Sequence, residues 1–489
     1  MRNVIFGSLT WFLPLGLSVV ATPIIVRSLG NSDYGIYALV LGFIGYSFTF
    51  NFGRAITKYV AEYRTTGETD RITEVISASI VLNVVIGLAG VIVMCLCANF
   101  LVADVLNIET SARERTVLAM YIASAIIFVS MLNQLFSSML QGIHRFDVYS
   151  KIFTANSFVL IAGNLVLAYL GYGLLQLLSW NLGVLLIFGV IYSVVAKRLL
   201  PEFKLRLRFS RETIFTVIRY SSGIVGYQIL ANLLLLFERG WITHRLGSEN
   251  LTYYVVPMSI GMYLHGFISS LVLVIFPLAS ELKDERERLL KLYTKATKII
   301  SLIVIFVIAS VVVNSQLFLG LWMGPGFVEH SSNLLVLHVI TFGLAAILTV
   351  SWQMSEGLGY PQYNVAIFSV CLVVSVALML ALTNGYGNSG VAVARLAGFG
   401  TIFFSIFLVE RLFFKHVQTR FWLTLAGCLG AAGIFGGAME YLVTAMLAPT
   451  WFTFLLSVFS GSVVFAFVLW LLDFVTVDEK ILIRSLIRR

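Results

Sequence analysis

Long hydrophobic runs recur along the whole chain, and only short polar segments separate them. A helix needs about 20 mostly apolar residues to cross the hydrocarbon core of a bilayer. The first run, from Val4 to Val26, is longer than the hydrophobic core of a signal peptide, so it is expected to be a transmembrane helix. The pattern predicts fourteen membrane-spanning helices, over 4–27, 34–61, 75–101, 117–141, 152–170, 174–196, 217–243, 251–280, 297–320, 333–356, 365–383, 390–411, 422–447 and 451–475.

The basic residues orient these predicted helices, because cytoplasmic loops carry an excess of Lys and Arg. An even number of spans places both termini on one side. Of the 33 Lys and Arg residues, all but six fall on that side, and the exceptions are Arg27, Arg113, Arg115, Arg239, Arg245 and Arg395. This asymmetry predicts a multi-pass protein of the plasma (inner) membrane with both termini in the cytoplasm. It also accounts for the net charge of +9 without a nucleic-acid partner.

Composition supports the same class. Hydrophobic residues make up 59% of the chain and charged residues only 12%, which leaves too little polar surface for a soluble protein of this size. We therefore expect an all-α polytopic membrane protein. The four cysteines lie inside apolar runs and show no spacing typical of disulfides or metal ligands.

The chain contains an internal repeat. Three short segments recur in order, at a nearly constant offset and at equivalent helix junctions: Ser28–Tyr37 with Arg245–Tyr254, Met139–His144 with Met354–Gly359, and Gly171–Gly173 with Gly385–Gly387. Each half holds six predicted helices, so both halves have the same orientation, as in transporters that open alternately to the two sides. The predicted division is an N-lobe over 1–200, a cytoplasmic linker over 201–216, a C-lobe over 217–415, and a final helix pair with an amphipathic tail over 416–489.

Several motifs resemble one family. They are Leu29-Gly30 with Tyr34-Gly35 and Tyr37, Gln141–Phe146, and Phe237–Arg239 with Leu246-Gly247 and Tyr253-Tyr254. With the fourteen spans and the repeat, they resemble the polysaccharide transporters, or O-antigen flippases, of the multidrug/oligosaccharidyl-lipid/polysaccharide (MOP) exporter superfamily. One departure is Glu238-Arg239, where many relatives have Asp-Arg.

The resemblance covers the whole chain and implies a V-shaped pair of six-helix lobes. It implies transport of a polyprenyl-pyrophosphate-linked oligosaccharide, an O-antigen or other surface-polysaccharide repeat unit, from the cytoplasmic to the outer leaflet. It also implies a polysaccharide polymerase and a chain-length regulator as partners, besides membrane lipids.

Charged residues within spans are costly and therefore mark candidate sites. We expect Arg54, Arg239 and Arg395 to line a central cavity and hold the pyrophosphate, because arginine forms strong charge-assisted hydrogen bonds with phosphate. Glu238 is expected either to pair with an arginine or to take part in coupling to a Na⁺ or H⁺ gradient. No cofactor or metal is expected. The alternatives are that Arg54 extends to the lipid headgroups and that Glu238 and Arg395 tie helices together.

Amide side chains form a second candidate set. The spans contain Asn83, Asn133, Gln134, Asn156, Asn164, Asn181, Gln228, Asn232 and Gln353. Six of these are taken as candidate sugar contacts: Asn83, Gln134, Asn164, Asn181, Gln228 and Asn232. The alternative for most of them is hydrogen bonding between helices.

Three other functions remain open. A multidrug exporter of the same superfamily would bind organic cations, yet the first predicted helix has no Asp or Glu. A flippase for a peptidoglycan precursor would also carry an anionic lipid. A membrane polysaccharide polymerase or ligase would need an active site in an outer loop, and the longest such loop, 103–116, carries no catalytic constellation. The chain is therefore not expected to be an enzyme.

Overall fold

The computed structural model describes residues 2–46, 53–200, 210–272 and 275–474 of the chain, and it describes side chains there except at 2–13, 54, 219–227 and 277. These residues form helices and short connections, with no strand among them. The expectation of an all-α protein is therefore confirmed. The chain divides into two compact units, Met1–Thr252 and Tyr253–Arg489.

The helices of the first unit are α1 (Arg2–Leu29), α2 (Asn31–Tyr46), α3 (Gly53–Thr66), α4 (Thr69–Phe100), η1 (Leu101–Val105), α5 (Thr110–Gly142), α6 (Phe146–Tyr169), α7 (Leu174–Leu199) and α8 (Arg211–Leu246). Helix α9 (Ser248–Val272) begins in this unit and continues into the second. Short turns with a glycine at positive φ, such as Gly30 and Gly171, connect successive helices because glycine lacks the side chain that makes this conformation costly.

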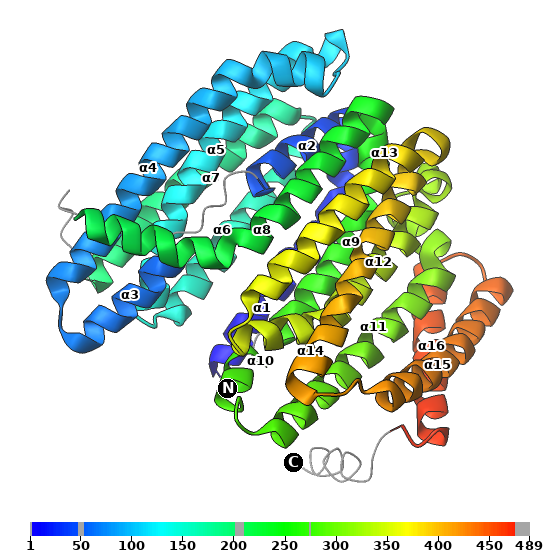
Figure 1. Cartoon of the computed structure of the whole chain (residues 1–489). Coiled ribbons are helices and arrows are strands. Elements are labelled where there is room, and N and C mark those ends of the chain that lie inside the picture. The colour runs from blue at the N-terminus through cyan, green and yellow to red at the C-terminus, as the bar shows by residue number, and fades with distance from the viewer. Residues whose placement is uncertain (1, 47–52, 201–209, 273–274, 475–489) are drawn as a thin grey trace. The chain divides into compact units, whose positions relative to one another are not determined.

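Helix α5 lies at the centre of the first unit, where it contacts α7, α4 and α3 (Figure 1). Helix α6 packs between α1 and α7, and α8 packs on α2 and α4. The contacts are apolar over long stretches, as in the cluster that includes Ile56, Ile76, Leu135 and Met139.

The second unit contains the rest of α9 with α10 (Ile275–Glu281), α11 (Arg286–Trp322), α12 (Pro325–Gly357), α13 (Pro361–Gly400), η2 (Thr401–Phe403), α14 (Phe404–Phe414), α15 (Thr419–Met446) and α16 (Trp451–Leu471). Helix α12 is its most buried element and packs on α11, α13 and α10. The pair α15–α16 packs on α11 through a smaller apolar cluster that includes Leu429 and Phe465.

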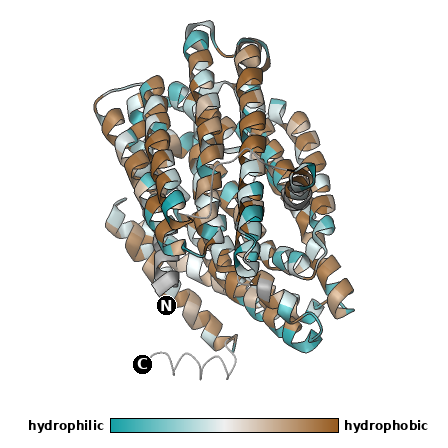
Figure 2. Cartoon of the chain, turned by 90° about the vertical axis from the view of Figure 1, so that its left-hand side faces the viewer, coloured by the Kyte–Doolittle hydropathy of each residue, from teal (hydrophilic) through white to brown (hydrophobic). Residues whose placement is uncertain are grey.

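Ten of the described helical segments are long and apolar enough to cross a membrane. One of them, Pro361–Phe414, covers two predicted spans, because α13 bends sharply at Gly387 (φ 53°, ψ −135°). Figure 2 shows hydrophobic residues, in brown, recurring along the long helices. Many hydrophobic side chains are exposed, such as Leu96 (78%) and Phe452 (72%). Exposed apolar surface on this scale requires lipid as solvent. The protein is a multi-pass membrane protein, and the count of fourteen spans stays a prediction.

The predicted lobes and the two compact units have different boundaries. The predicted first lobe ends at 200, whereas the first unit extends to Thr252 because α8 packs on α2, α3 and α4. The predicted boundaries rest on the helix count and the repeat, and they stay a prediction.

The second repeat segment has equivalent surroundings in both units. Helix α5 ends at Gly142 and α12 at Gly357. A Cβ atom at Gly142 would lie 3.0 Å from Val60 on α3, and one at Gly357 would lie 2.5 Å from the carbonyl oxygen of Phe276 on α10. Each glycine therefore allows close approach to a neighbouring helix, α3 in the first unit and α10 in the second.

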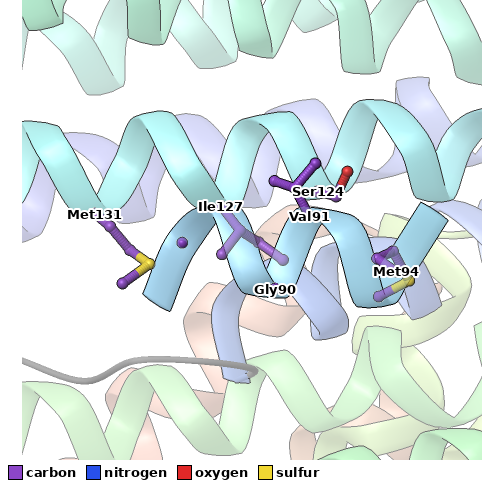
Figure 3. Close-up of a pocket in the computed structure, with 7 residues that line it drawn as sticks. Gly90, Val91, Met94, Ser124, Ile127 and Met131 are labelled. Atoms are coloured by element: carbon purple, nitrogen blue, oxygen red, sulfur yellow. The ribbon is translucent and has the colours of Figure 1, made fainter. Parts of the chain in front are cut away.

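A small apolar cavity lies between α4 and α5 (Figure 3). Gly90, Val91 and Met94 face Ser124 and Ile127 across it, and its volume is about 10 Å³. This is about the space of one water molecule, and an apolar lining of this kind gives water few partners. The cavity is therefore a packing feature and too small for cargo.

Candidate functional site

A larger cavity with a polar lining, here called the polar pocket, lies within the first unit. It is formed by α3, α5, α6 and α7 and has a volume of about 380 Å³. This volume is within the range of small-molecule sites, about 300–1,000 Å³. The residues that line it are Thr57, Ser130, Asn133, Gln134, Ser137, Ser138, Gln141, Tyr149, Phe153, Asn156, Leu185 and Tyr192.

The polar pocket follows one end of its helices. On α5 it extends from Ser130 to Gln141, next to the end of the helix at Gly142. Twelve residues of α-helix span about 18 Å, and the hydrocarbon core is about 30 Å thick. By the predicted span 117–141, a run of hydroxyl and amide groups therefore extends from one end of that span to about its middle. By the predicted orientation, that end is the cytoplasmic one.

Some of the pocket's polar groups are already engaged. Asn133 donates from Nδ2 to the carbonyl oxygen of Leu185 (2.8 Å) and so ties α5 to α7. Thr57 donates to the carbonyl oxygen of Ser138 (3.2 Å), which ties α3 to α5. In contrast, the buried Oδ1 atom of Asn156 accepts no hydrogen bond in the described structure. An unsatisfied amide oxygen beside a cavity is costly unless a ligand or water donates to it.

Aromatic rings complete the lining. Tyr149 and Phe153 lie on successive turns of α6 with their ring centroids 5.8 Å apart, and Tyr192 on α7 is buried. Aromatic faces offer apolar contact area, and the tyrosine hydroxyl adds a hydrogen-bonding group. None of the described residues that line the pocket is charged. This chemistry suits a neutral ligand with many hydroxyl groups and apolar ring faces.

The structure separates the six candidate sugar contacts. Gln134 lines the polar pocket. Asn164 and Asn181 are buried and both donate to the hydroxyl of Tyr37 (3.4 Å each), so they join α6 and α7 to α2. Asn83 is buried and donates to the carbonyl oxygen of Ser79 on its own helix. Gln228 and Asn232 lie half-buried on α8, outside the pocket lining.

Arg239 and Glu238 lie on α8 in the first unit. Arg239 donates from Nη1 to the carbonyl oxygen of Ala38, and its guanidinium carbon lies 5.1 Å from the centre of the Tyr46 ring. A Cβ atom at Gly42 would lie 2.7 Å from Arg239, so the glycine makes room for this side chain against α2. Glu238 is fully buried.

Arg395 lies on α13 in the second unit and is 1% exposed. Its guanidinium carbon lies 5.4 Å from the ring centre of Phe342 and 6.0 Å from that of Phe399, which are favourable cation–π distances. Arg54 lies in α3, three residues before Thr57, and its side chain is outside the described residues. A common pyrophosphate site for the three arginines stays a prediction.

Asn133 and Asn156 were among the amides expected within the spans but not among the candidate sugar contacts. Tyr149 and Tyr192 were not among the candidates either. A signal was present, because Asn133, Gln134, Ser137, Ser138 and Gln141 follow one another on one stretch of the same predicted helix. Residues three and four positions apart share a helix face. That spacing could have indicated a polar stripe.

The first repeat segments of the chain's two halves contact each other within the first unit. The hydroxyls of Ser32 and Ser248 lie 2.9 Å apart, and Thr252 donates to the carbonyl oxygen of Asn31. A Cβ atom at Gly35 would lie 1.8 Å from the carbonyl oxygen of Ser248. The start of α2 and the start of α9 are therefore packed backbone to backbone, which only glycine at position 35 permits.

Comparison with known proteins identifies the family. Residues 1–283, more than half of the chain, match the family model described as "Polysaccharide biosynthesis protein". The chain belongs to this family. A protein of Shigella flexneri named "Putative O-antigen transporter" is 21% identical over 403 residues, which cover 81% of this chain and 93% of that protein.

Solved structures show the fold of this member of the polysaccharide biosynthesis protein family. "Lipid II flippase MurJ, inward closed conformation" matches 99% of this chain and 100% of its own, with 14% identity and a TM-score of 0.74. An inward-facing multidrug resistance MATE family transporter of the MOP superfamily matches 82% of this chain and 97% of its own, with 17% identity and a TM-score of 0.71. The resemblance drawn from the sequence and the MOP-type fold are both confirmed.

Proposed function

We propose that this protein is a flippase for a polyprenyl-pyrophosphate-linked oligosaccharide, such as an O-antigen or another surface-polysaccharide repeat unit. It would carry the cargo from the cytoplasmic to the outer leaflet of the inner membrane by alternating access. The family, the relative from Shigella flexneri and the MOP-type fold support a transporter of this class. The proposal includes cytoplasmic termini and, as partners, a polysaccharide polymerase and a chain-length regulator.

The polar pocket is the observation that carries the proposed cargo. A sugar brings hydroxyl groups that lose their water partners inside a membrane, and each must find a new hydrogen bond. Amide and hydroxyl side chains supply both donors and acceptors, and the tyrosine and phenylalanine rings of α6 can pack on the apolar faces of sugar rings. The unsatisfied Oδ1 atom of Asn156 is a ready acceptor for a sugar hydroxyl.

The lining of the polar pocket also distinguishes between classes of cargo. A site for organic cations would be expected to contain a carboxylate that offsets the buried positive charge, and the described lining has no Asp or Glu. The pyrophosphate of the cargo carries negative charge. We propose that Arg54, Arg239 and Arg395 bind it through charge-assisted hydrogen bonds. Glu238 remains a proposed partner for an arginine or for a coupling ion.

The test is transport in vesicles that contain the purified protein and a lipid-linked oligosaccharide. The fraction of cargo in the outer leaflet is measured by its accessibility to a glycosidase or lectin. We expect Gln134→Leu and Asn156→Leu each to lower the transport rate at limiting cargo about 5–150-fold, because an unmatched buried polar group costs about 1–3 kcal/mol.

Gln176→Leu serves as the matched control, because Gln176 is an exposed amide of α7 outside the polar pocket. It should transport like the unaltered protein. Unchanged transport in both pocket variants, at equal protein levels, would refute the sugar-binding role of the pocket.

The same vesicles distinguish the other functions. A lipid-linked peptidoglycan precursor and an organic cation are supplied in turn as competing cargo. Stronger transport of either would replace the proposed cargo, and elongation of the supplied oligosaccharide would indicate a polymerase or ligase.

A further inference from the structure

A second cluster of buried polar side chains lies in the other unit, where α15 and α16 pack on α11. Glu440 of α15 is 1% exposed. Its carboxylate accepts a hydrogen bond from the hydroxyl of Ser310 (2.6 Å) and one from Nδ2 of Asn314 (2.5 Å), both on α11. Ser457 of α16 donates to Oδ1 of Asn314 (2.8 Å). Four side chains from three helices therefore form one network around a single carboxyl group.

Three of the four members lie at a similar distance from one end of their helices. Glu440 and Ser457 are each six residues, or about 9 Å, from the helix ends at Met446 and Trp451. Asn314 is eight residues, or about 12 Å, from the end of α11 at Trp322. By the predicted orientation these ends face the outside. By the predicted spans 422–447 and 451–475, the carboxyl group lies inside the hydrocarbon, about two helical turns from its outer surface.

No positive charge accompanies this carboxyl group in the described structure. Helix α16 contains no titratable residue, and α11 contains none from 299 to its end. The basic residue of α11 nearest in sequence is Lys298, which lies twelve residues, or about 18 Å, before Ser310. Its Nζ donates to the carbonyl oxygen of Phe474 (2.6 Å). On α15 itself the other titratable groups are Arg420 and Cys428, in its first half, and Tyr441, which is 64% exposed.

An ionised carboxylate is costly in such surroundings. Neutral hydrogen-bond donors offset only part of the desolvation cost of a charge inside a membrane. The group must therefore be neutralised, either by a bound proton or by a bound metal cation. A hydroxyl can donate or accept, so Ser310 can serve both the ionised and the protonated carboxyl group.

The packing favours a proton over a metal cation. A Cβ atom at Gly461 of α16 would lie 2.3 Å from Cγ and 2.4 Å from Oε1 of Glu440, so the glycine is what admits this side chain. Both carboxylate oxygens are already at hydrogen-bond distance from their partners. A metal cation would have to displace these contacts, whereas a proton needs no additional volume.

We propose that Glu440 is a proton-binding site of this protein, occupied while α15 is packed on α11 and α16. Arriving at the ionised group, the proton forms an O–H bond on one carboxylate oxygen, and that O–H donates to the hydroxyl oxygen of Ser310. The site is separate from the polar pocket and from the proposed arginines. It does not depend on the identity of the cargo.

Infrared difference spectroscopy of the full-length protein in lipid vesicles tests this proposal. We expect a protonated-carboxyl absorption at neutral pH that disappears reversibly at alkaline pH. Glu440→Gln, whose amide has nearly the same shape, should lose this absorption and keep any absorption from the buried Glu238 and Glu410. Replacement of Na⁺ by K⁺ should leave the titration unchanged. Ser310→Ala should keep the absorption but shift its frequency, because the carboxyl group loses one hydrogen-bond partner.

Glu410→Gln is the matched control, because Glu410 is also buried but is held by Tyr293, Trp422 and the backbone N–H of Gln418. It should leave the titrating absorption in place. The proposal is overturned if Glu440→Gln removes no such absorption, if the absorption never titrates while the protein is folded, or if Na⁺ shifts the titration.

Discussion

Gly189→Ala tests how closely the polar pocket depends on the packing behind it. Gly189 lies on α7, opposite Asn133 on α5. A Cβ atom there would lie 2.4 Å from Oδ1 of Asn133, which is at least about 1 Å inside the optimum for non-bonded atoms. The amide must therefore turn away from α7 and toward the pocket that it lines.

The effect on stability and the effect on transport should differ. Turning Asn133 breaks its 2.8 Å hydrogen bond to Leu185, a net loss of about 0.5–1.5 kcal/mol. Alanine recovers up to about 1 kcal/mol in a helix interior, so the free energy of unfolding should change by at most about 1.5 kcal/mol. A displaced amide in the pocket should weaken cargo binding by about 1–3 kcal/mol, or about 5–150-fold.

The assay pairs thermal unfolding with transport in vesicles. Gly183→Ala on the same helix is the control, because a Cβ atom there meets nothing within 4 Å. In the double variant Gly189→Ala/Asn133→Ala the clash is gone, and transport should equal that of Asn133→Ala alone. The reasoning would be refuted if the double variant lost as much transport as the two single variants combined. Full transport by Gly189→Ala would also refute it.

Three further predictions follow from buried contacts. Tyr37→Phe removes the hydroxyl to which two buried amides donate, so the free energy of unfolding should fall by about 1–3 kcal/mol. An unchanged melting curve would contradict this hydrogen-bond network. Glu410→Gln weakens a carboxylate that three donors contact, and should lower the melting temperature without abolishing transport. If Arg239 and Arg395 hold the pyrophosphate, then Lys at either position should retain more transport than Gln at equal protein levels, and equal activity would remove that residue from the proposed site.

Much of the fold could be predicted because a membrane demands long apolar helices. Runs of about 20 apolar residues have few other uses, so the spans appear directly in the pattern. The repeat was also detectable, because short segments recur in order, and one recurring glycine, Gly142 and Gly357, ends a helix in each unit at a close contact. The kink at Gly387 was less visible, since glycine within an apolar run does not by itself show whether the helix bends or ends.

The candidate site was harder to predict, because residue type alone does not say which way a side chain points. Asn164, Asn181 and Gln134 are all amides within predicted spans. The two asparagines donate hydrogen bonds to the hydroxyl of Tyr37, whereas Gln134 lines the polar pocket. Arg395 was expected to line a central cavity; its guanidinium carbon lies near the rings of Phe342 and Phe399, and its role in a cavity stays a prediction. Glu440 was not singled out at all, because its neutral partners come from two helices that the sequence cannot pair with its own.

The most direct test of the proposed function is to locate the sugar during transport. A lipid-linked oligosaccharide with a photoreactive group on its first sugar is crosslinked to the full-length protein in vesicles, and the labelled peptides are identified by mass spectrometry. We predict labels on the segments 130–141, 149–156 and 185–192 that surround the polar pocket, and competition by unlabelled cargo. Labels confined to other segments, with none in these three, would contradict the account.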